Sequence, residues 1–315
     1  MAAPSTTGQL SQFMPKYWDT VLGENMYPNL YFYQFGTKRT LPRNFGKTIL
    51  IPRLKKQNIM ATVTEGTIIG TCPISGQFIS GTLTQFGGAY KHSDVLVMTA
   101  LSDVIELSLI DIGRDIARRM DAHIRGALTG TGTFLCDKAA VMKPINIAKA
   151  VTLLDAGDNS RPPDNHYPTI IRPEAIFDIM TNLSGVQWLE VTKYTEGNVN
   201  RAYIGEVGRL FGARFVTSTN LKRLVSAGVA ANASGFKGYM IAPDAYYVTE
   251  INDMVARTYV HQLGSAGAAD PINQQATVGA KVFFGVVPAA WTSTEYRVVR
   301  LNFMTTVQAA GAPPY

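Results

Sequence analysis

The chain has 315 residues, of which 46% are hydrophobic and 17% are charged, and its formal net charge is +6. The hydrophobic share excludes a wholly disordered chain, and no apolar run reaches the ~18 residues that a membrane-spanning helix needs. With only Cys72 and Cys136, a disulfide framework and a four-cysteine zinc site are excluded, so a reducing compartment is expected.

Residues 1–30 are rich in small and polar side chains, which predicts an arm with little core of its own. No secretory signal is expected, because residues 1–10 lack a basic start followed by an apolar stretch. One short helix is predicted over residues 12–22 from the spacing of Phe13, Tyr17, Val21 and Leu22. The aromatic cluster at residues 31–35 favours an anchor packed on protein over stacking on nucleic-acid bases.

A basic segment follows the arm, and no Asp or Glu occurs between Asn25 and Thr64. Its basic residues are Lys38, Arg39, Arg43, Lys47, Arg53, Lys55 and Lys56. A segment of like charge repels itself unless an acidic surface lies against it. One interpretation is a solvated basic surface. The other, which we favour, is a segment that docks on a polyanion or on an acidic patch of a neighbouring molecule.

Two strands are predicted to form a long hairpin. Residues 47–54 alternate with a period of two, and Pro52 indicates an edge strand because it cannot donate a ladder hydrogen bond. Residues 78–90 form the second predicted strand, and residues 59–76 between the two are punctuated by glycine and proline. An isolated two-stranded ribbon is marginally stable in water, so this hairpin needs another surface to lie on.

The clearest helix is predicted over residues 102–128, with Ser102 as N-cap. Its apolar stripe has the helical period and comprises Ile105, Leu109, Ile112, Ile116, Met120, Ile124 and Ala127. Its charged residues are placed on the opposite, solvated face: Asp111, Arg114, Asp115, Arg118, Arg119, Asp121 and Arg125. The (i, i+4) spacings of Asp115 to Arg119 and of Asp121 to Arg125 predict a ladder of salt bridges.

The remaining chain mixes strands and helices, which predicts an α+β fold. Strands are predicted at residues 167–171, 213–218, 238–242, 277–287 and 296–303, and a mobile loop at 226–235. A helix is predicted to start at Pro173, with one apolar face formed by Ile176, Phe177, Met180 and Leu183.

No motif for catalysis, cofactor binding or metal binding is found. The four histidines, His92, His123, His166 and His261, lack metal-ligand spacing, and no nucleophile elbow or phosphate loop occurs. The weak candidates for an enzyme are Glu206, Cys136 and the pair Asp111 and Asp115. We predict no catalytic residue, no cofactor and no metal.

Several strings, in this order and spacing, resemble the major capsid proteins of tailed bacteriophages. They are LPRNFGKT at 41–48, TEG at 64–66, QFGGAY at 85–90, IGEVGRLFGARFV at 204–216 and ATVGAKVFFG at 276–285. The resemblance covers about residues 10–305.

The resemblance implies the Johnson fold of capsid proteins. Its N-terminal arm would be residues 1–45 and its extended β-hairpin, the E-loop, residues 46–92. A peripheral domain would comprise residues 93–140 and 246–315, with a long spine helix at 102–128. An axial domain with a central sheet would be residues 141–245.

The same resemblance implies a structural protein of the virion, present in the host cytoplasm during assembly. It would join copies of itself as pentamers and hexamers into an icosahedral shell around double-stranded DNA, without a membrane. Scaffolding, portal and decoration proteins are the further partners. The arm is short and uncharged at its start, so a separate scaffold protein, or none, is expected. The basic segment would lie against an acidic surface of the adjacent subunit, with some of its residues facing DNA.

Three alternatives stay open at this stage. An encapsulin-type shell shares the fold and encloses protein cargo instead of DNA. A DNA-binding module using residues 38–56 would bind DNA tightly, with a steep salt dependence. An enzyme would line a deep pocket with the weak candidates named above.

Overall fold

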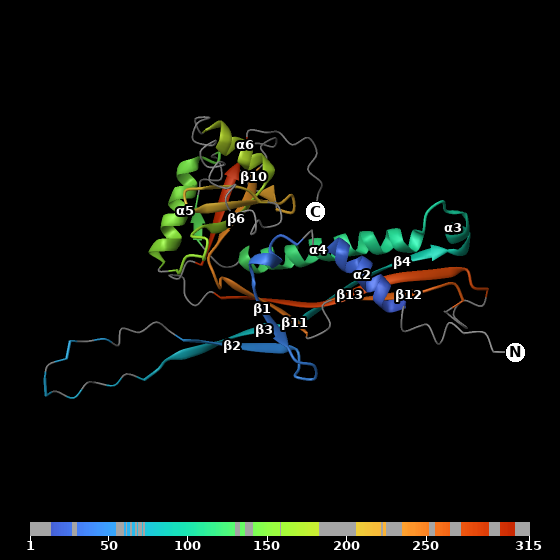
Figure 1. The fold of residues 1–315 in the computed structure, drawn as a ribbon, viewed down its shortest axis with the longest axis horizontal. Helices are drawn as coiled ribbons and strands as arrows, with labels where there is room; N and C mark the ends of the chain where they lie inside the picture. The colour runs from blue at the N-terminus through green and yellow to red at the C-terminus, as the bar shows by residue number, and fades with distance from the viewer. Residues whose placement is uncertain are drawn as a thin grey trace.

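The computed structural model describes residues 14–26, 30–54, 60, 62–63, 65–66, 68, 71, 73–129, 133–135, 141–157, 159–182, 206–221, 223–224, 235–251, 256–264, 272–289 and 297–305. Lys55, Lys56, both cysteines, Leu183 and most of the predicted loop at 226–235 lie outside these residues. Figure 1 shows an elongated molecule with a helix-backed sheet along its length, a second sheet to one side and a two-stranded ribbon reaching past both.

The first sheet is built on one long strand, β13 (Gln275–Pro288). β4 (Thr84–Ser93) pairs with one edge of β13, while β12 (Ala256–His261) and β11 (Tyr246–Ile251) follow each other along the opposite edge. β1 (Thr37–Leu41) extends the sheet by pairing parallel to β11. Burial alternates along β13, so that Val278, Ala280 and Val282 face a covered side and the residues between them face the other.

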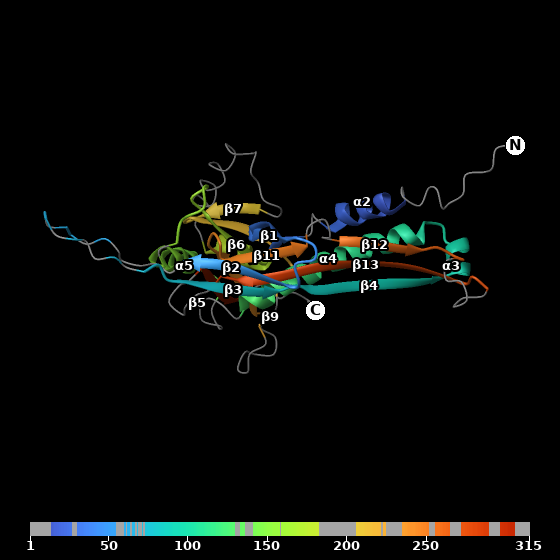
Figure 2. The ribbon, with the colours of Figure 1, turned by 90° about the horizontal axis from the view of Figure 1, so that it is seen from below.

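The long helix α4 (Val104–Thr129) and the arm helix α2 (Met14–Met26) cover one side of this sheet (Figures 1 and 2). The predicted apolar stripe of α4 is confirmed, because Leu109, Ile116 and Ile124 are buried. The predicted N-cap is wrong by one residue. The Asp103 carboxylate accepts hydrogen bonds from the backbone N–H groups of Ile105 (2.9 Å) and Glu106 (3.4 Å), so Asp103 caps the helix in place of Ser102.

The arm has more core than predicted. Val21, Leu22 and Met26 on α2 are buried in the same cluster as the apolar stripe of α4. Gly113 lets the two helices approach closely, because a Cβ there would lie 3.1 Å from the backbone oxygen of Leu22. The spacing of Val21 and Leu22 predicted a helix, but it did not reveal that the helix is buried, because the α4 stripe that covers these side chains is distant in sequence.

The second sheet has the order β5 (Thr133–Leu135), β14 (Val298–Met304), β10 (Gly235–Ile241), β6 (Tyr167–Ile171), β8 (Ala213–Thr217) and β7 (Glu206–Leu210), with β9 (Arg223–Leu224) paired to β10. α5 (Pro144–Ala156) and α6 (Pro173–Thr181) belong to this body. The strands at 167–171 and 213–218 and the start of α6 at Pro173 agree with the sequence prediction. The predicted face of α6 is wrong, since Ala175, Ile176 and Ile179 are buried and Phe177 is 53% exposed.

The C-terminal strand corrects the predicted domain limits. β14 lies between β10 and β5, in antiparallel register with all of β10 from Gly235–Met304 to Ile241–Val298. Its residues Val299, Leu301 and Phe303 are buried in the core of the second sheet. Residues 298–304 therefore belong with residues 141–245 rather than with the first sheet.

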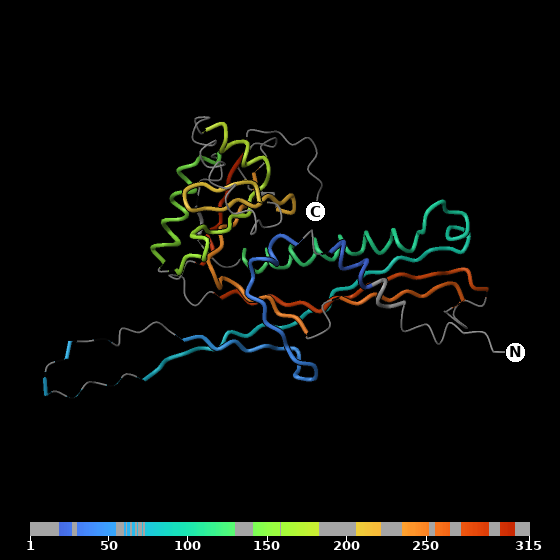
Figure 3. The backbone as a smooth tube through the Cα atoms, in the orientation of Figure 1, coloured from blue at the N-terminus to red at the C-terminus, as the bar shows by residue number. Residues whose placement is uncertain are grey.

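The predicted hairpin is present as a two-stranded ribbon, but its second strand is shorter than predicted. β2 (Thr48–Leu54) pairs antiparallel with β3 (Gly76–Thr82), and this ribbon extends beyond both sheets (Figure 3). The single strand predicted over 78–90 is two strands, because the buried Leu83 separates β3 from β4 and the chain changes partner from β2 to β13. Gly81 permits the crossing, since a Cβ there would lie 1.9 Å from a methyl carbon of Val287.

Candidate functional site

The ribbon has one packed face and one bare face. On the packed face, Ile51 is buried against Tyr247 and Val287 of the first sheet. Arg53 donates a hydrogen bond from its guanidinium to the carbonyl oxygen of Ala289. These contacts hold the base of the ribbon on the end of β13. The alternation of residues 47–54 predicted the strand but not the surface on which it packs.

The bare face, which we call the ribbon face, consists of Leu50, Pro52, Leu54 and Phe78. Pro52 and Phe78 are direct cross-strand partners, so the four side chains share one side. Leu54 is 72% and Phe78 67% exposed. Farther along, Met60, Ile68 and Ile74 are exposed as well. A contiguous apolar surface on a monomeric protein is unusual and marks a contact with another molecule.

A second apolar surface lies at the opposite end of the long axis (Figure 1). It surrounds α3 (Asp94–Thr99), a short helix with no buried residue, and the start of α4. We call it the α3 surface; its exposed residues are Val95, Leu96, Met98, Leu101 and Leu107. Sequence reasoning missed this surface, although the apolar run at residues 95–101 beside a predicted helix was the available signal.

The two apolar surfaces carry charges of opposite sign. Arg43 and Lys47 are exposed at the base of the ribbon. Asp94 lies in the first turn of α3, and Asp103 and Glu106 lie at the N-terminal end of α4. The positive end of the helix dipole favours these acids there.

The predicted basic segment does not form a single stripe. Lys38 and Arg39 are neighbours on β1 and point to opposite faces, with the Lys38 ammonium 4.5 Å from the Tyr33 ring centroid and the Arg39 guanidinium 5.9 Å from that of Tyr247. Arg43 and Lys47 are exposed, whereas Arg53 is half-buried. The structure therefore divides these cations between the sheet, the ribbon base and the packed face of the ribbon.

Asp121 is the largest departure from the predicted charge ladder. Its side chain is fully buried rather than solvated, and it accepts hydrogen bonds from the backbone N–H groups of Tyr31 (2.9 Å) and Phe32 (3.2 Å). Burial raises the pKa of Asp121 to about 7, although the backbone donors and Arg125 act in the opposite direction. Asp121 lies one turn after Ala117 in the buried stripe of α4, which was the signal that could have revealed its position.

The Asp121 carboxylate thus fastens the aromatic anchor at residues 31–35 to α4. Tyr246 adds to this fastening, since its buried hydroxyl donates a hydrogen bond to the carbonyl oxygen of Phe32. Phe32 itself is fully buried, with its ring edge-on to Tyr239 at a centroid distance of 5.6 Å. The prediction that this cluster packs on protein is confirmed.

The other members of the ladder are exposed, except the half-buried Arg125, but they are not paired as predicted. Within the described part of the chain, no ion pair joins Asp115 to Arg119 or Asp121 to Arg125 within 4.0 Å. Asp111 instead accepts a hydrogen bond from the Tyr90 hydroxyl at 2.5 Å, and this bond raises the pKa of Tyr90. The Asn220 side-chain amide donates a hydrogen bond to the backbone carbonyl of Arg118. The Arg125 guanidinium donates one to the backbone carbonyl of Asn220.

Among the weak enzyme candidates, Cys136 lies outside the described residues, and Glu206 belongs to a cluster of ion pairs. Glu206 pairs with the buried guanidinium of Arg214, which also binds Asp164 at 2.7 Å, and Arg209 completes the cluster. Such a cluster joins β7, β8 and the loop before β6. Among the described residues, no group of three or more His, Cys, Asp or Glu side chains is arranged to hold a metal ion.

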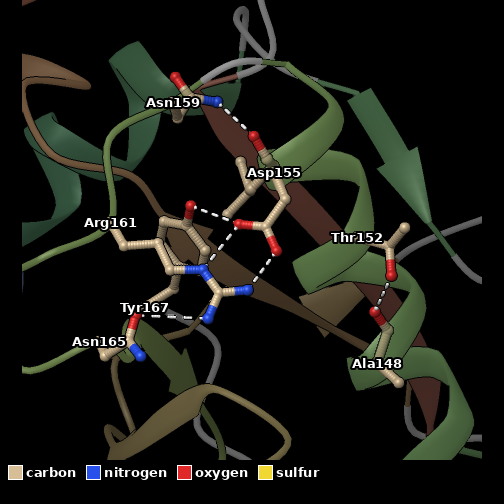
Figure 4. A network of polar contacts seen from close by, with 8 residues as sticks. Ala148, Thr152, Asp155, Asn159, Arg161, Asn165 and Tyr167 are labelled. Atoms are coloured by element: carbon tan, nitrogen blue, oxygen red, sulfur yellow. Dashed lines mark hydrogen bonds and ion pairs between the residues drawn. The ribbon is translucent and has the colours of Figure 1, made fainter.

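A second polar network closes the loop between α5 and β6 (Figure 4). The Arg161 guanidinium binds both oxygens of the Asp155 carboxylate at 3.1 and 2.5 Å, and the Tyr167 hydroxyl donates to the same carboxylate at 2.9 Å. These contacts lower the pKa of Asp155, with the Arg161 hydrogen bonds as the main cause. The network joins the end of α5 to the start of β6 across a surface loop.

No described helix combines the length and the apolar character required to cross a membrane.

Of the comparisons with known proteins, the one with solved structures shows the fold. No protein-family model and no curated protein matches the sequence. The structure is similar to the capsid of Ralstonia phage GP4, with a TM-score of 0.69 and 11% identity over 90% of this chain and 93% of that chain. It is also similar to the capsid of cyanophage P-SCSP1u, with a TM-score of 0.61 and 14% identity over 88% and 89%.

A third similar structure is a virus-like particle from Pyrococcus furiosus, with a TM-score of 0.55 and 10% identity over 91% of this chain and 99% of that chain. The chain thus has the mixed α+β fold of phage capsid proteins, as the sequence resemblance predicted.

Proposed function

We propose that this chain is the major capsid protein of a tailed bacteriophage and assembles into the icosahedral shell that encloses its double-stranded DNA. The observation that carries the proposal is the similarity of fold to phage capsid structures over about nine-tenths of both chains. The unpartnered ribbon face supports it from the residues themselves. The role is structural, in the virion, and requires no cofactor.

In this proposal each part of the fold has a family counterpart. The ribbon β2–β3 is the E-loop, α4 is the spine helix, and the first sheet with α4 is the peripheral domain. The second sheet, with β14 included, is the axial domain. The ribbon lies at one end of the long axis and the α3 surface at the other (Figure 1).

We propose further that the ribbon face of one subunit covers the α3 surface of the next. Both surfaces are apolar, and their flanking charges are complementary, with Arg43 and Lys47 on one and Asp94, Asp103 and Glu106 on the other. A contact between two different surfaces of the same molecule repeats head to tail and closes into rings when the rotation permits. Pentamers and hexamers are such rings.

This contact would also stabilise the ribbon. A two-stranded ribbon is marginal alone, and the bare ribbon face would lose its exposed apolar area against a neighbour. Lys55 and Lys56 continue the same strand in sequence, so we propose that they contact the neighbour or the packaged DNA.

Electron microscopy of the purified chain tests the proposal. Closed shells built from this chain alone, or with a scaffold protein supplied in trans, are the expected result. A chain that stays monomeric at high concentration under both conditions would overturn it.

The second candidate is an encapsulin-type shell, favoured by the similarity to the Pyrococcus particle. Absorbance of purified particles at 260 and 280 nm distinguishes the two, since packaged DNA dominates the first wavelength and protein cargo the second. A free DNA-binding module is less favoured, because the basic side chains Lys38 and Arg39 point to opposite faces of β1.

A further inference from the structure

The ribbon covers the side of the first sheet that faces away from α4 at its end, at Tyr247 and Val287. The part of this side formed by β4, β13 and β12 is not covered by any element among the described residues. We call it the open sheet face. It is built from the outward positions of β4, β13 and β12, which lie in three cross-strand rows. These rows are Lys91–Thr277–His261, Ala89–Gly279–Tyr259 and Gly87–Lys281–Arg257.

The middle of the open sheet face is a hollow of about 460 Å³. Its floor consists of Gly87, Ala89 and Gly279, and its walls include Tyr259 and Lys281. Gly279 keeps the floor low, because a Cβ there would lie 3.0 Å from the Cβ of Ala89. A floor of small residues lets an extended backbone approach the sheet closely.

The charge on this face is of one sign. Lys91, Arg257 and Lys281 stand around the hollow, and no outward position of the described strands β4, β12 and β13 carries a carboxylate. The Lys281 ammonium lies 5.1 Å from the Tyr259 ring centroid and 5.6 Å from that of Phe283. Among the residues that the structure describes, no acid lies within 4.0 Å of these three cations.

We propose that the open sheet face is a docking site for an acidic, extended segment of another protein. The three cations supply charge complementarity to carboxylates, and the hollow beside the exposed Tyr259 ring receives the backbone and a small apolar side chain of the segment. Duplex DNA contacts protruding cations through its phosphates and has no group that would enter a recessed floor of glycine and alanine. The proposal goes beyond shell assembly, because this face is separate from the ribbon face and from the α3 surface.

A labelled peptide of alternating glutamate and alanine, titrated with the full-length chain and followed by fluorescence anisotropy, tests the proposal. The wild-type chain is expected to bind the peptide, and its affinity for the peptide is expected to fall as the salt concentration rises from about 50 mM to about 500 mM. Lys91→Glu combined with Lys281→Glu is expected to lower the affinity by about tenfold or more, because it places like charges against the peptide.

Two further variants separate the causes. Lys143→Glu combined with Lys149→Glu makes the same change in net charge on α5, away from this sheet, and is expected to keep the wild-type affinity. Tyr259→Ser leaves the three cations in place but removes the wall of the hollow, and we expect a loss of several-fold.

Three results would overturn the proposal. One is an absence of peptide binding, and another is an equal loss of affinity in the α5 control. The third is tight binding of a random-sequence DNA duplex, with an affinity at least equal to that of the peptide, that the same double variant abolishes. That result would assign the face to nucleic acid. The titration measures peptide binding, and micrographs of the same samples show whether shells form. A failure of this proposal can therefore be told apart from a failure of the proposed function.

Discussion

The ribbon β2–β3 and the arm helix α2 both belong to the N-terminal part of the chain, yet α2 packs on α4 and the first sheet, whereas the ribbon leaves one face bare. α2 inserts Leu22 and Met26 into the core, and the anchor that follows it is fastened by two backbone hydrogen bonds to Asp121. The ribbon is fastened only at its base, through Ile51 and Arg53. The arm therefore belongs to the fold of the single chain, whereas the ribbon face remains available to another molecule.

The difference has a physical cause. One face of α2 and the aromatic anchor both meet the stripe of α4, so Val21, Leu22, Met26 and Phe32 are buried without a partner molecule. A two-stranded ribbon has two faces, and the chain offers only the end of β13 to cover one of them. Substitutions in the two regions should consequently change different measurements.

Truncation of the anchor is expected to have the largest effect on the single chain. Phe32→Ala removes a fully buried ring and should lower the free energy of unfolding by about 3–5 kcal/mol. Denaturant unfolding under dissociating conditions measures this. A loss below ~1 kcal/mol would mean that the arm is not part of the core of the single chain.

Asp121 should make the fastening of the arm depend on pH. Its pKa is about 7 in the folded chain against 3.8 as the ordinary value, so between these pH values the folded chain holds a proton that the unfolded chain has released. The free energy of unfolding therefore falls as pH rises from 3.8 towards 7, by at most ~1.4 kcal/mol per pH unit, and is flat above.

Asp121→Asn removes this titration and keeps the shape of the side chain. As pH rises from 3.8 towards 7, the free energy of unfolding of the wild type should fall relative to that of the variant. Parallel stability curves for the two proteins would contradict the role of Asp121. Asp115→Asn, on the exposed side of α4, is the matched control.

Substitution on the ribbon face should leave the single chain almost unchanged. Phe78→Ser removes a ring that is 67% exposed, so the free energy of unfolding should change by about 0.5 kcal/mol or less. Shell formation, scored by electron microscopy and light scattering, should be lost or need a higher protein concentration. Phe177→Ser, an exposed ring on α6, controls for the loss of apolar area elsewhere.

Charge reversal at the ribbon base should have the smallest effect on stability. Arg43→Glu combined with Lys47→Glu is expected to change the unfolding free energy by only a few tenths of a kcal/mol, because both side chains are exposed. It should slow assembly and reduce the salt sensitivity of its rate. Lys55→Glu combined with Lys56→Glu should act in the same direction, and unchanged assembly in both variants would exclude an electrostatic role for the segment.

The sequence predicted much of the fold wherever a pattern was periodic. The apolar stripe of α4, the alternation of residues 47–54, the strand at 167–171 and the start of α6 at Pro173 were all read from local spacing. β1, β11 and β12 were missed. Their residues alternate only weakly, and they become strands because β13 offers two edges to pair with.

The candidate surfaces were predicted only in part. The need of the hairpin for another surface followed from its length and composition, whereas the α3 surface was overlooked because an apolar run beside a helix is usually core. The basic segment was recognised as a run of charge, but strand geometry sends Lys38 and Arg39 to opposite faces, which composition cannot reveal.

Local spacing alone thus determined the long amphipathic helix, the ribbon and the mixed α+β class, since each depends on neighbours within a few turns or one hairpin. Tertiary structure alone decided that Asp121 is buried, that β14 joins the second sheet and that the chain changes partner at Leu83. These outcomes depend on contacts between residues that are distant in sequence. The partners are 57 to 69 positions apart for β10 and β14, about 90 for Asp121 and 182 to 200 for β4 and β13. A local pattern carries no information about which distant strand or backbone group will be the partner.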